Sequence, residues 1–171
     1  KQEEVQAEQK NQGEETQVVS NPNIRVLLMT DGYKNTIHPS VTVSSTSGLS
    51  ITYGETVEEC EAGAEVTFMP DDSRFQSGNI RIQAKEGEIT VNSLKRGYRV
   101  PSYQGILELR TTAEGIAIIN ELPVENYLCR VVPSEMPSGY EIEALKAQAV
   151  CARSYAYRQM AEYGYPEYEA H

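Results

Sequence analysis

Residues 115–132 read GIAIINELPVENYLCRVV, and the spacing of apolar side chains changes within this stretch. The run GIAIIN is short and rich in β-branched residues, which is typical of a strand. After Leu122 the apolar residues recur at steps of three and four, as one face of a helix requires; they are Val124, Tyr127, Leu128, Val131 and Val132. The stretch therefore predicts that a β-rich region ends, and a helical region begins, near residue 121.

The chain before this point consists of short apolar runs separated by turn-forming residues. The runs, in order, are IRVLLMT, VTVSS, LSITY, EVTFM, NIRIQA, EITVN, ILELRT and GIAIIN. The breaks between them carry Gly, Asp, Asn, Ser and Pro at a spacing of about ten residues, which favours antiparallel strands in a sheet, barrel or sandwich. Residues 24–120 are predicted to be β-rich.

The chain after this point has the features of two helices. Pro133 is predicted to stop the first and short one, and a loop PSEMPSGY follows. The run EIEALKAQAVCARSYAYRQMAEY, from Glu141 to Tyr163, consists largely of good helix formers, and Gly164 and Pro166 end it. The fold class is therefore α+β, with a helical part over residues 121–164.

Composition excludes several kinds of protein. The formal net charge of −10 disfavours general binding to nucleic acid, which needs clustered Lys and Arg. No apolar run approaches the length needed to cross a bilayer. Residues 1–23 are rich in Gln, Glu and Asn and are predicted to be a disordered polar linker or stalk.

The cysteines do not indicate a metal site. Cys60, Cys129 and Cys151 are odd in number and form no C-x-x-C pair, so neither a disulfide framework nor zinc spacing is present. A bridge between Cys129 and Cys151 is conceivable in an oxidising compartment. Small cysteines packed in the core are the favoured interpretation.

Glu135 is the side chain with the clearest chemical potential. Pro133 and Pro137 flank it at two residues' distance, which predicts a stiff loop, and its apolar neighbours would raise the pKa of a carboxyl. A carboxyl of this kind can act as a general acid. The local pattern alone favours the alternative, a solvated loop glutamate near the N-terminus of the long helix.

The long helix carries candidate binding residues. Lys146 and Arg153 lie seven residues apart, so both could point along one groove toward Glu135, although two solvated cations are the commoner case. Gln148, Ser154 and Tyr155 lie on other faces and are weaker candidates. Tyrosines at helical spacing, Tyr127 among them, are more often core or rim residues than sugar platforms.

Several spaced motifs together resemble the stage II sporulation protein D family, which includes the amidase enhancer proteins. They are YQGIL from Tyr103, INELPVENYL from Ile119, VVPSEMP from Val131 and EALKAQAVCARSYA from Glu143. The resemblance covers roughly residues 24–163 and is densest over 103–156. It implies one such domain over residues 24–171, expected to continue beyond His171.

This resemblance implies a function in the bacterial cell envelope. The expected activity is that of a lytic transglycosylase, which cleaves the MurNAc-GlcNAc bond of peptide-stripped peptidoglycan and leaves 1,6-anhydro-MurNAc ends, during septal wall remodelling and engulfment of the forespore. It implies Glu135 as the catalytic residue and Lys146, Arg153, Ser134 and Gln148 as substrate-binding residues. No cofactor is expected, although the complete domain could bind zinc, with His171 as one ligand.

The resemblance also implies partners and a location. Glycan strands, a cell-wall amidase and an engulfment membrane complex are the expected partners. The protein would be extracytoplasmic and anchored by an N-terminal membrane segment that is absent from this chain, which begins with Lys1.

Departures from the family pattern leave alternatives open. Arg130 stands where the family commonly has Gly, and Cys151 and Ser154 replace the commoner Ala and Thr. One alternative is a non-catalytic amidase enhancer, which would bind and activate an N-acetylmuramoyl-L-alanine amidase. Another is a structural interaction domain of the engulfment machinery, in which Glu135 is incidental.

Overall fold

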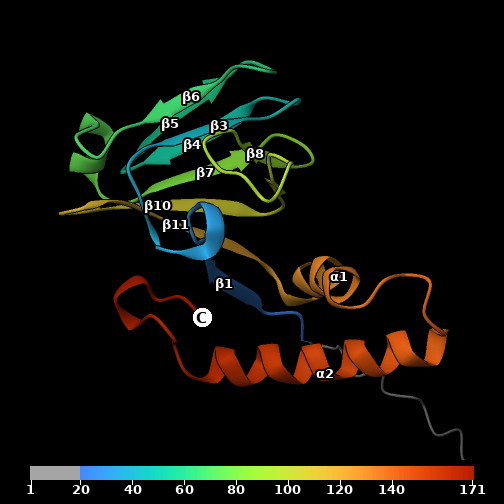
Figure 1. Cartoon of the computed structure of the whole chain (residues 1–171). Coiled ribbons are helices and arrows are strands. Elements are labelled where there is room, and N and C mark those ends of the chain that lie inside the picture. The colour runs from blue at the N-terminus through green and yellow to red at the C-terminus, as the bar shows by residue number, and fades with distance from the viewer. Residues whose placement is uncertain (1–19) are drawn as a thin grey trace, which may run out of the picture.

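The computed structural model describes residues 20–171, and residues 1–19 of the predicted linker lie outside the described part. Two antiparallel sheets form the N-terminal part, and two helices and a short C-terminal segment follow them (Figure 1). The predicted α+β class is confirmed.

The larger sheet is built around two long neighbouring strands, β10 (Ile106–Thr112) and β11 (Gly115–Pro123). On the far side of β10 the order continues through β7 (Ile80–Ala84), β4 (Leu49–Tyr53) and β5 (Thr56–Cys60). On the other side β11 pairs with β1 (Asn23–Leu27) and with the short β2 (Ile37–His38). The first described strand of the chain therefore lies beside the last.

The smaller sheet has the order β6 (Val66–Phe68), β3 (Val41–Ser44), β8 (Ile89–Val91) and β9 (Ser102–Tyr103). The two sheets share one buried apolar cluster, so the β-rich part is a sandwich. Three 3₁₀ turns complete the described secondary structure: η1 (Asp31–Tyr33), η2 (Ser73–Ser77) and η3 (Pro166–Tyr168). The sandwich gives the helices a rigid base.

Three strands were not predicted from the sequence. β2 and β9 have two residues each, too few to show a period. β5 has the sequence TVEEC and lies at the sheet edge, where it pairs with β4 alone and exposes Val57. An edge strand with polar side chains on both faces carries no alternation, and its charges protect the edge from pairing with other chains.

The two helices are α1 (Val124–Glu135) and α2 (Ile142–Ala161). The prediction that Pro133 stops the first helix is wrong, because α1 contains Pro133 and continues to Glu135. Pro133 lies in the last turn, where only two residues follow it. The Met136 N–H donates to the Val132 carbonyl at 2.9 Å and closes that turn. Glu135 is therefore the last residue of a helix and does not lie in a loop.

Gly105 allows the chain to pass from β9 to β10. Its φ of +84° is left-handed, and a Cβ there would lie 2.3 Å from the Glu121 carbonyl oxygen and 2.8 Å from Leu122 Cβ. Only glycine satisfies both conditions without strain. This close passage brings residues 102–104 next to β11.

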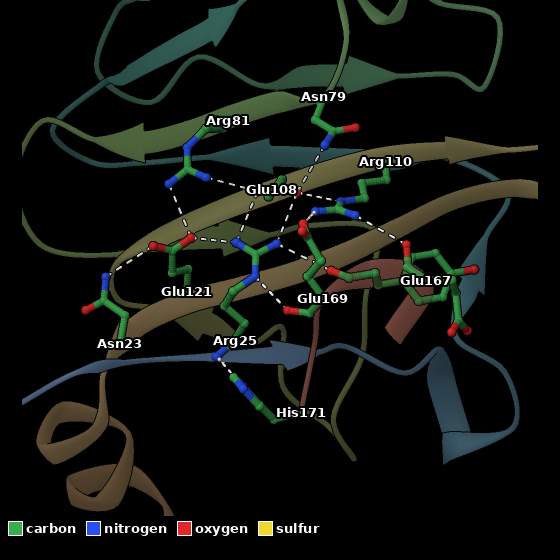
Figure 2. Close-up of polar contacts among 11 residues, drawn as sticks. Asn23, Arg25, Asn79, Arg81, Glu108, Arg110, Glu121, Glu167, Glu169 and His171 are labelled. Atoms are coloured by element: carbon green, nitrogen blue, oxygen red, sulfur yellow. Dashed lines mark hydrogen bonds and ion pairs between the residues drawn. The ribbon is translucent and has the colours of Figure 1, made fainter. Parts of the chain in front are cut away.

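A cluster of ion pairs occupies the outer face of the larger sheet (Figure 2). Glu108 on β10 is at its centre, with a side chain that is 5% exposed. It accepts hydrogen bonds from Arg25, Arg81 and Arg110 at distances of 2.6–3.2 Å, and from Asn79 at 3.3 Å. Burial works to raise the pKa of Glu108, but the hydrogen bonds and charges of Arg25 and Arg110 hold it below its usual value. One carboxylate thus connects three strands.

The C-terminal segment attaches to the same cluster (Figure 2). Arg110 pairs with the Glu169 carboxylate at 2.6 Å, and Arg25 donates to the Glu169 carbonyl at 2.9 Å. The His171 N–H donates to the Arg25 carbonyl at 2.8 Å, and His171 Nδ1 accepts the Arg25 N–H at 3.1 Å. The cluster therefore fixes the chain after α2 to β1.

Residues 20–23, the described end of the predicted linker, contact the helices. The Val124 N–H donates to the Pro22 carbonyl at 2.9 Å, and the Tyr157 hydroxyl donates to the Ser20 carbonyl at 3.0 Å. Asn21 Oδ1 accepts the Glu125 N–H at 3.1 Å. Pro22 and Asn21 thus satisfy N–H groups in the first turn of α1, which otherwise lack partners.

Replacement of Glu108 tests the ion cluster. Glu108→Gln leaves three arginines without their shared counter-charge, so we expect the free energy of unfolding at pH 7 to fall by roughly 3 kcal/mol. Since the pKa of Glu108 is lowered in the folded state, its contribution is present above the ordinary value of about 4.3 and is lost as the pH falls below it. The variant and the parent should therefore converge in stability in acid. Urea unfolding between pH 7 and pH 3 measures this, with Glu59→Gln, which removes an exposed pair with Lys85, as the control. A constant difference across this range would contradict the assignment.

Candidate functional site

Glu135 ends α1 at a point where α2 passes close to it. Its side chain is exposed, and Gln148 on α2 donates from Nε2 to Glu135 Oε2 at 2.5 Å. This hydrogen bond orients one carboxylate oxygen. The other oxygen, Oε1, is the one that Glu135 can offer to a ligand.

The carboxyl lies in a hollow of about 320 Å³ between the two helices. α1 contributes Tyr127, Val131 and Glu135, and α2 contributes Gln148, Cys151, Ala152 and Tyr155. The α2 residues recur at steps of three and four, so they form one stripe on the helix. Among the described residues that line this hollow, Glu135 is the one carboxylic acid.

Tyr127 connects this hollow to two others. It also lines a hollow of about 220 Å³ over β1 and β11, and one of about 370 Å³ that reaches Tyr165 and His171. Burial raises the pKa of Tyr127, and the charge of Glu135 raises it further. The phenol therefore keeps its proton at neutral pH and can donate a hydrogen bond where the three hollows meet.

Comparison with known proteins identifies the region that contains this site. Residues 112–171, which include β11, both helices and the C-terminal segment, match the family described as SpoIID, stage II sporulation protein. These residues are similar to the SpoIID family. Glu135, Gln148 and Tyr127 all lie within the matching region.

Three relatives are similar to parts of this chain. Stage II sporulation protein D of Bacillus subtilis is 34% identical over 93 residues, which are 50% of this chain and 26% of that protein. Stage II sporulation protein D of Bacillus amyloliquefaciens is 48% identical over 42 residues, 25% of this chain and 12% of that protein. An uncharacterized protein of Brachyspira hyodysenteriae is 44% identical over 54 residues, 32% of this chain and 15% of that protein. The chain thus spans about a quarter or less of these relatives, and no solved structure matches it.

The two cations predicted to point toward Glu135 are paired with other carboxylates. Lys146 is exposed and contacts Glu143 at 2.9 Å on its own helix. Arg153 donates to both carboxylate oxygens of Glu125, at 2.8 Å and 2.6 Å. The hydrogen bond from Arg153 lowers the pKa of Glu125, and its charge acts in the same direction. Arg153 therefore connects α2 to the first turn of α1.

Ser134 and Arg130 lie at the edge of the hollow over β1 and β11. Ser134 Oγ donates to the Val131 carbonyl at 2.7 Å, within the last turn of α1. Arg130 forms an ion pair with Glu88, which follows the turn before β8. The bulky cation at the position where the family commonly has Gly thus lies at the rim of this hollow.

The prediction of packed core cysteines is wrong for both helical cysteines. Cys129 and Cys151 are exposed, and the structure has all three cysteines as free thiols, with Cys60 half-buried. Both helices present only a narrow face to the sandwich, and α2 buries Ala156 alone. Cys151 instead lines the hollow that contains Glu135.

Residues 20–171 contain neither a cluster of metal ligands nor a helix suited to span a membrane. In this part of the chain no three His, Cys, Asp or Glu side chains gather as metal ligands would. No described helix has the length and apolar character needed to span a membrane.

The contribution of Gln148 and Tyr127 was underestimated from the sequence. The sequence makes Gln148 a weaker candidate because it lies on another face of the long helix than Lys146 and Arg153. Its spacing to Cys151, Ala152 and Tyr155 was the available signal, since these four residues share one face of α2. Tyr127 lies on α1 at two helical turns from Glu135, which also puts both on one face.

The contact between Arg153 on α2 and Glu125 on α1 can be tested by a pair of substitutions. Arg153→Gln removes the two-pronged contact with Glu125, and we expect it to lower the free energy of unfolding by about 1 kcal/mol, since both side chains are more than a third exposed. Lys146→Gln removes an exposed pair within one helix and should change stability by less than about 0.5 kcal/mol. Thermal unfolding of both variants measures this. Equal effects would show that Arg153 does not hold the helices together.

Proposed function

We propose that this chain is the part of a lytic transglycosylase that carries its catalytic carboxyl, and that it acts on peptidoglycan strands stripped of their stem peptides. The observation that supports this most is Glu135, held by Gln148 through one oxygen and set in a hollow that has tyrosines on both helices. The hollow is open, so a polymer can enter it without being threaded by its end.

In the proposed reaction Glu135 acts first as an acid. Its proton passes to the glycosidic oxygen as the bond from that oxygen to C1 of muramic acid breaks. The resulting carboxylate then accepts the proton of the C6 hydroxyl, and the C6 oxygen bonds to C1. The product is a 1,6-anhydro sugar, and no water is consumed.

A single carboxyl is sufficient for this sequence of steps. Hydrolytic glycosidases use two carboxyl groups on opposite sides of the scissile bond, one of them to activate water or to bond to the sugar. Glu135 is the one carboxylic acid among the described lining residues. An attacking group supplied by the sugar removes the need for the second carboxyl.

The neighbouring side chains have supporting roles in this proposal. Gln148 fixes the carboxyl in one orientation, so that the same oxygen faces the sugar in both steps. The aromatic faces of Tyr127 and Tyr155, which line the same hollow, can pack against sugar rings. Lys146 does not line the hollow and pairs with Glu143 on the surface of α2. In this proposal it contacts the glycan strand only outside the hollow.

The proposal includes the setting that the family name suggests. A sporulation protein that cuts glycan acts in the envelope, outside the cytoplasmic membrane, and a cell-wall amidase would supply the peptide-free strands. The rival function is that of an amidase enhancer that does not cut glycan. For that function the carboxyl of Glu135 would be dispensable.

A digest of purified peptide-free glycan strands tests the reaction. We expect the parent protein to produce anhydro-MurNAc ends, detected by mass spectrometry as termini lighter by one water. Glu135→Gln should reduce the rate by at least about 100-fold, since it removes the acid and the base together. Gln148→Ala should reduce it by about 10-fold, because the carboxyl loses its fixed orientation.

The control is Glu143→Gln, which removes an exposed carboxyl one turn from Lys146 and should leave the rate unchanged. Reducing ends in place of anhydro ends would mean hydrolysis and would contradict the proposed mechanism. Full activity of Glu135→Gln would do the same. Stimulation of an amidase by a protein that leaves the glycan uncut would favour the rival function.

A further inference from the structure

A tight hairpin between β8 and β9 presents a tyrosine to solvent. The Arg96 N–H donates to the Arg99 carbonyl at 2.8 Å, and the Arg99 N–H donates to the Arg96 carbonyl at 3.2 Å. Gly97 and Tyr98 are therefore the two residues of the turn, and Gly97 has the left-handed φ of +61° that such turns favour. Tyr98, at the tip, is fully exposed. Its ring has no apolar surface of its own chain to cover it.

The segment η1 fixes the base of this hairpin. The Arg96 guanidinium donates to the Met29 carbonyl at 2.5 Å and lies 4.8 Å from the centre of the Tyr33 ring, a cation–π contact. The Lys95 N–H donates to the Asp31 carboxylate at 2.7 Å. The hairpin is thus held in place before any partner arrives, which lowers the entropy cost of binding.

The exposed side chains around this contact are basic or apolar. We call them the basic patch, and they are Tyr33 and Lys34 at the end of η1 and Lys95, Tyr98, Arg99 and Val100 on the hairpin.

The cations of the basic patch have no counter-charge within the described part of the chain. Lys34, Lys95 and Arg99 pair with no carboxylate of residues 20–171, and neither does the anchoring Arg96. Every other described Lys and Arg except Arg158 forms an ion pair. Unpaired cations are therefore concentrated at this one surface.

Acidic residues are missing from the segments that carry the patch, although the protein has 25 of them and a formal net charge of −10. Residues 32–54 and 89–107 contain no Asp or Glu. Asp31, which holds the Lys95 N–H, is the acid in contact with the hairpin. Charges elsewhere on an exposed surface are screened beyond roughly 8 Å at physiological salt. The patch is thus locally positive on an acidic protein.

This combination of side chains fits the surface of an anionic bilayer. Lys and Arg attract anionic headgroups. Tyrosine is favoured at the boundary between headgroups and acyl chains, where its ring is in an apolar medium and its hydroxyl meets water. A soluble phosphate polymer would engage the cations, but it would leave the exposed apolar surface of Tyr98 and Val100 in water.

We propose that the basic patch docks the folded domain on an anionic lipid surface, with the tip of the hairpin inserted among the headgroups. The inference goes beyond the proposed function and does not depend on it, since no residue of the patch lines the hollow that contains Glu135. Binding to lipid and cleavage of glycan can therefore be measured separately.

Sedimentation with lipid vesicles tests the role of charge. We expect the parent to bind vesicles of equal parts phosphatidylglycerol and phosphatidylcholine, and to bind phosphatidylcholine alone at least about 10-fold more weakly. Arg99→Gln should weaken binding to the anionic vesicles about 5-fold, and Lys95→Gln with Arg99→Gln about 25-fold. The matched control is Arg158→Gln, which removes an exposed unpaired cation from α2 and should change the affinity less than about 2-fold.

Three results would overturn the charge assignment. They are absence of binding to the anionic vesicles, equal binding to both kinds of vesicle, and equal losses for Arg99→Gln and Arg158→Gln. Thermal unfolding verifies that the variants fold. All of them should cleave peptide-free glycan at the parent rate, so failure of vesicle binding would leave the proposed function standing.

Insertion of the tip is tested by fluorescence. The protein has no Trp, so Tyr98→Trp introduces a single reporter at the tip of the hairpin. With anionic vesicles we expect its emission to shift to the blue and to be quenched by lipids brominated on their acyl chains. Soluble poly(glycerol phosphate) should bind more weakly and give no shift. If this polymer binds as tightly as the vesicles, or if the reporter stays in water on bound vesicles, the patch is a site for phosphate groups and the bilayer assignment is refuted.

Discussion

The pairing of β11 with a strand on each side is the constraint on which the rest of the structure depends. β11 pairs with β10 from Gly115 to Glu121 and with β1 from Ile119 to Pro123. Its last residue, Pro123, directly precedes α1, so the position of the helix follows from the strand. The ion cluster around Glu108 then fixes β1, β10 and the C-terminal segment to one another, and so fixes the chain that follows α2. Glu135 is positioned through these elements, even though its own side chain is exposed.

The fold could be predicted from the sequence where an element has a clear local pattern. The strands β4, β7, β10 and β11 were visible as short apolar runs, because their side chains are largely buried. α2 was visible as a run of good helix formers. β5 was missed because an edge strand has no buried face of its own. The end of α1 was misplaced because Pro133 prevents one hydrogen bond and does not forbid two more helical residues. Local sequence patterns therefore predicted which strands and helices form. The residue at which α1 ends depended on a single hydrogen bond, from Met136 to Val132.

The candidate site was predicted less well, for a physical reason. The position of Glu135 between two prolines, together with the family resemblance, identified the central carboxyl. Its partners depend on how α1 and α2 are rotated about their axes, which the order of residues does not state. The seven-residue spacing of Lys146 and Arg153, and the family resemblance, indicated these two cations, but the carboxylates of Glu143 and Glu125 hold them. The neutral Gln148 reaches Glu135 instead.

This distribution of partners has a chemical consequence. A cation in contact with Glu135 would stabilise its charged form and oppose the acid step, whereas an amide donor orients the carboxyl without adding a charge. Arg153 performs the structural task of joining the helices at Glu125, in the first turn of α1, well away from the last turn where Glu135 lies. The groups that maintain the fold thus leave the free oxygen of Glu135 available for chemistry.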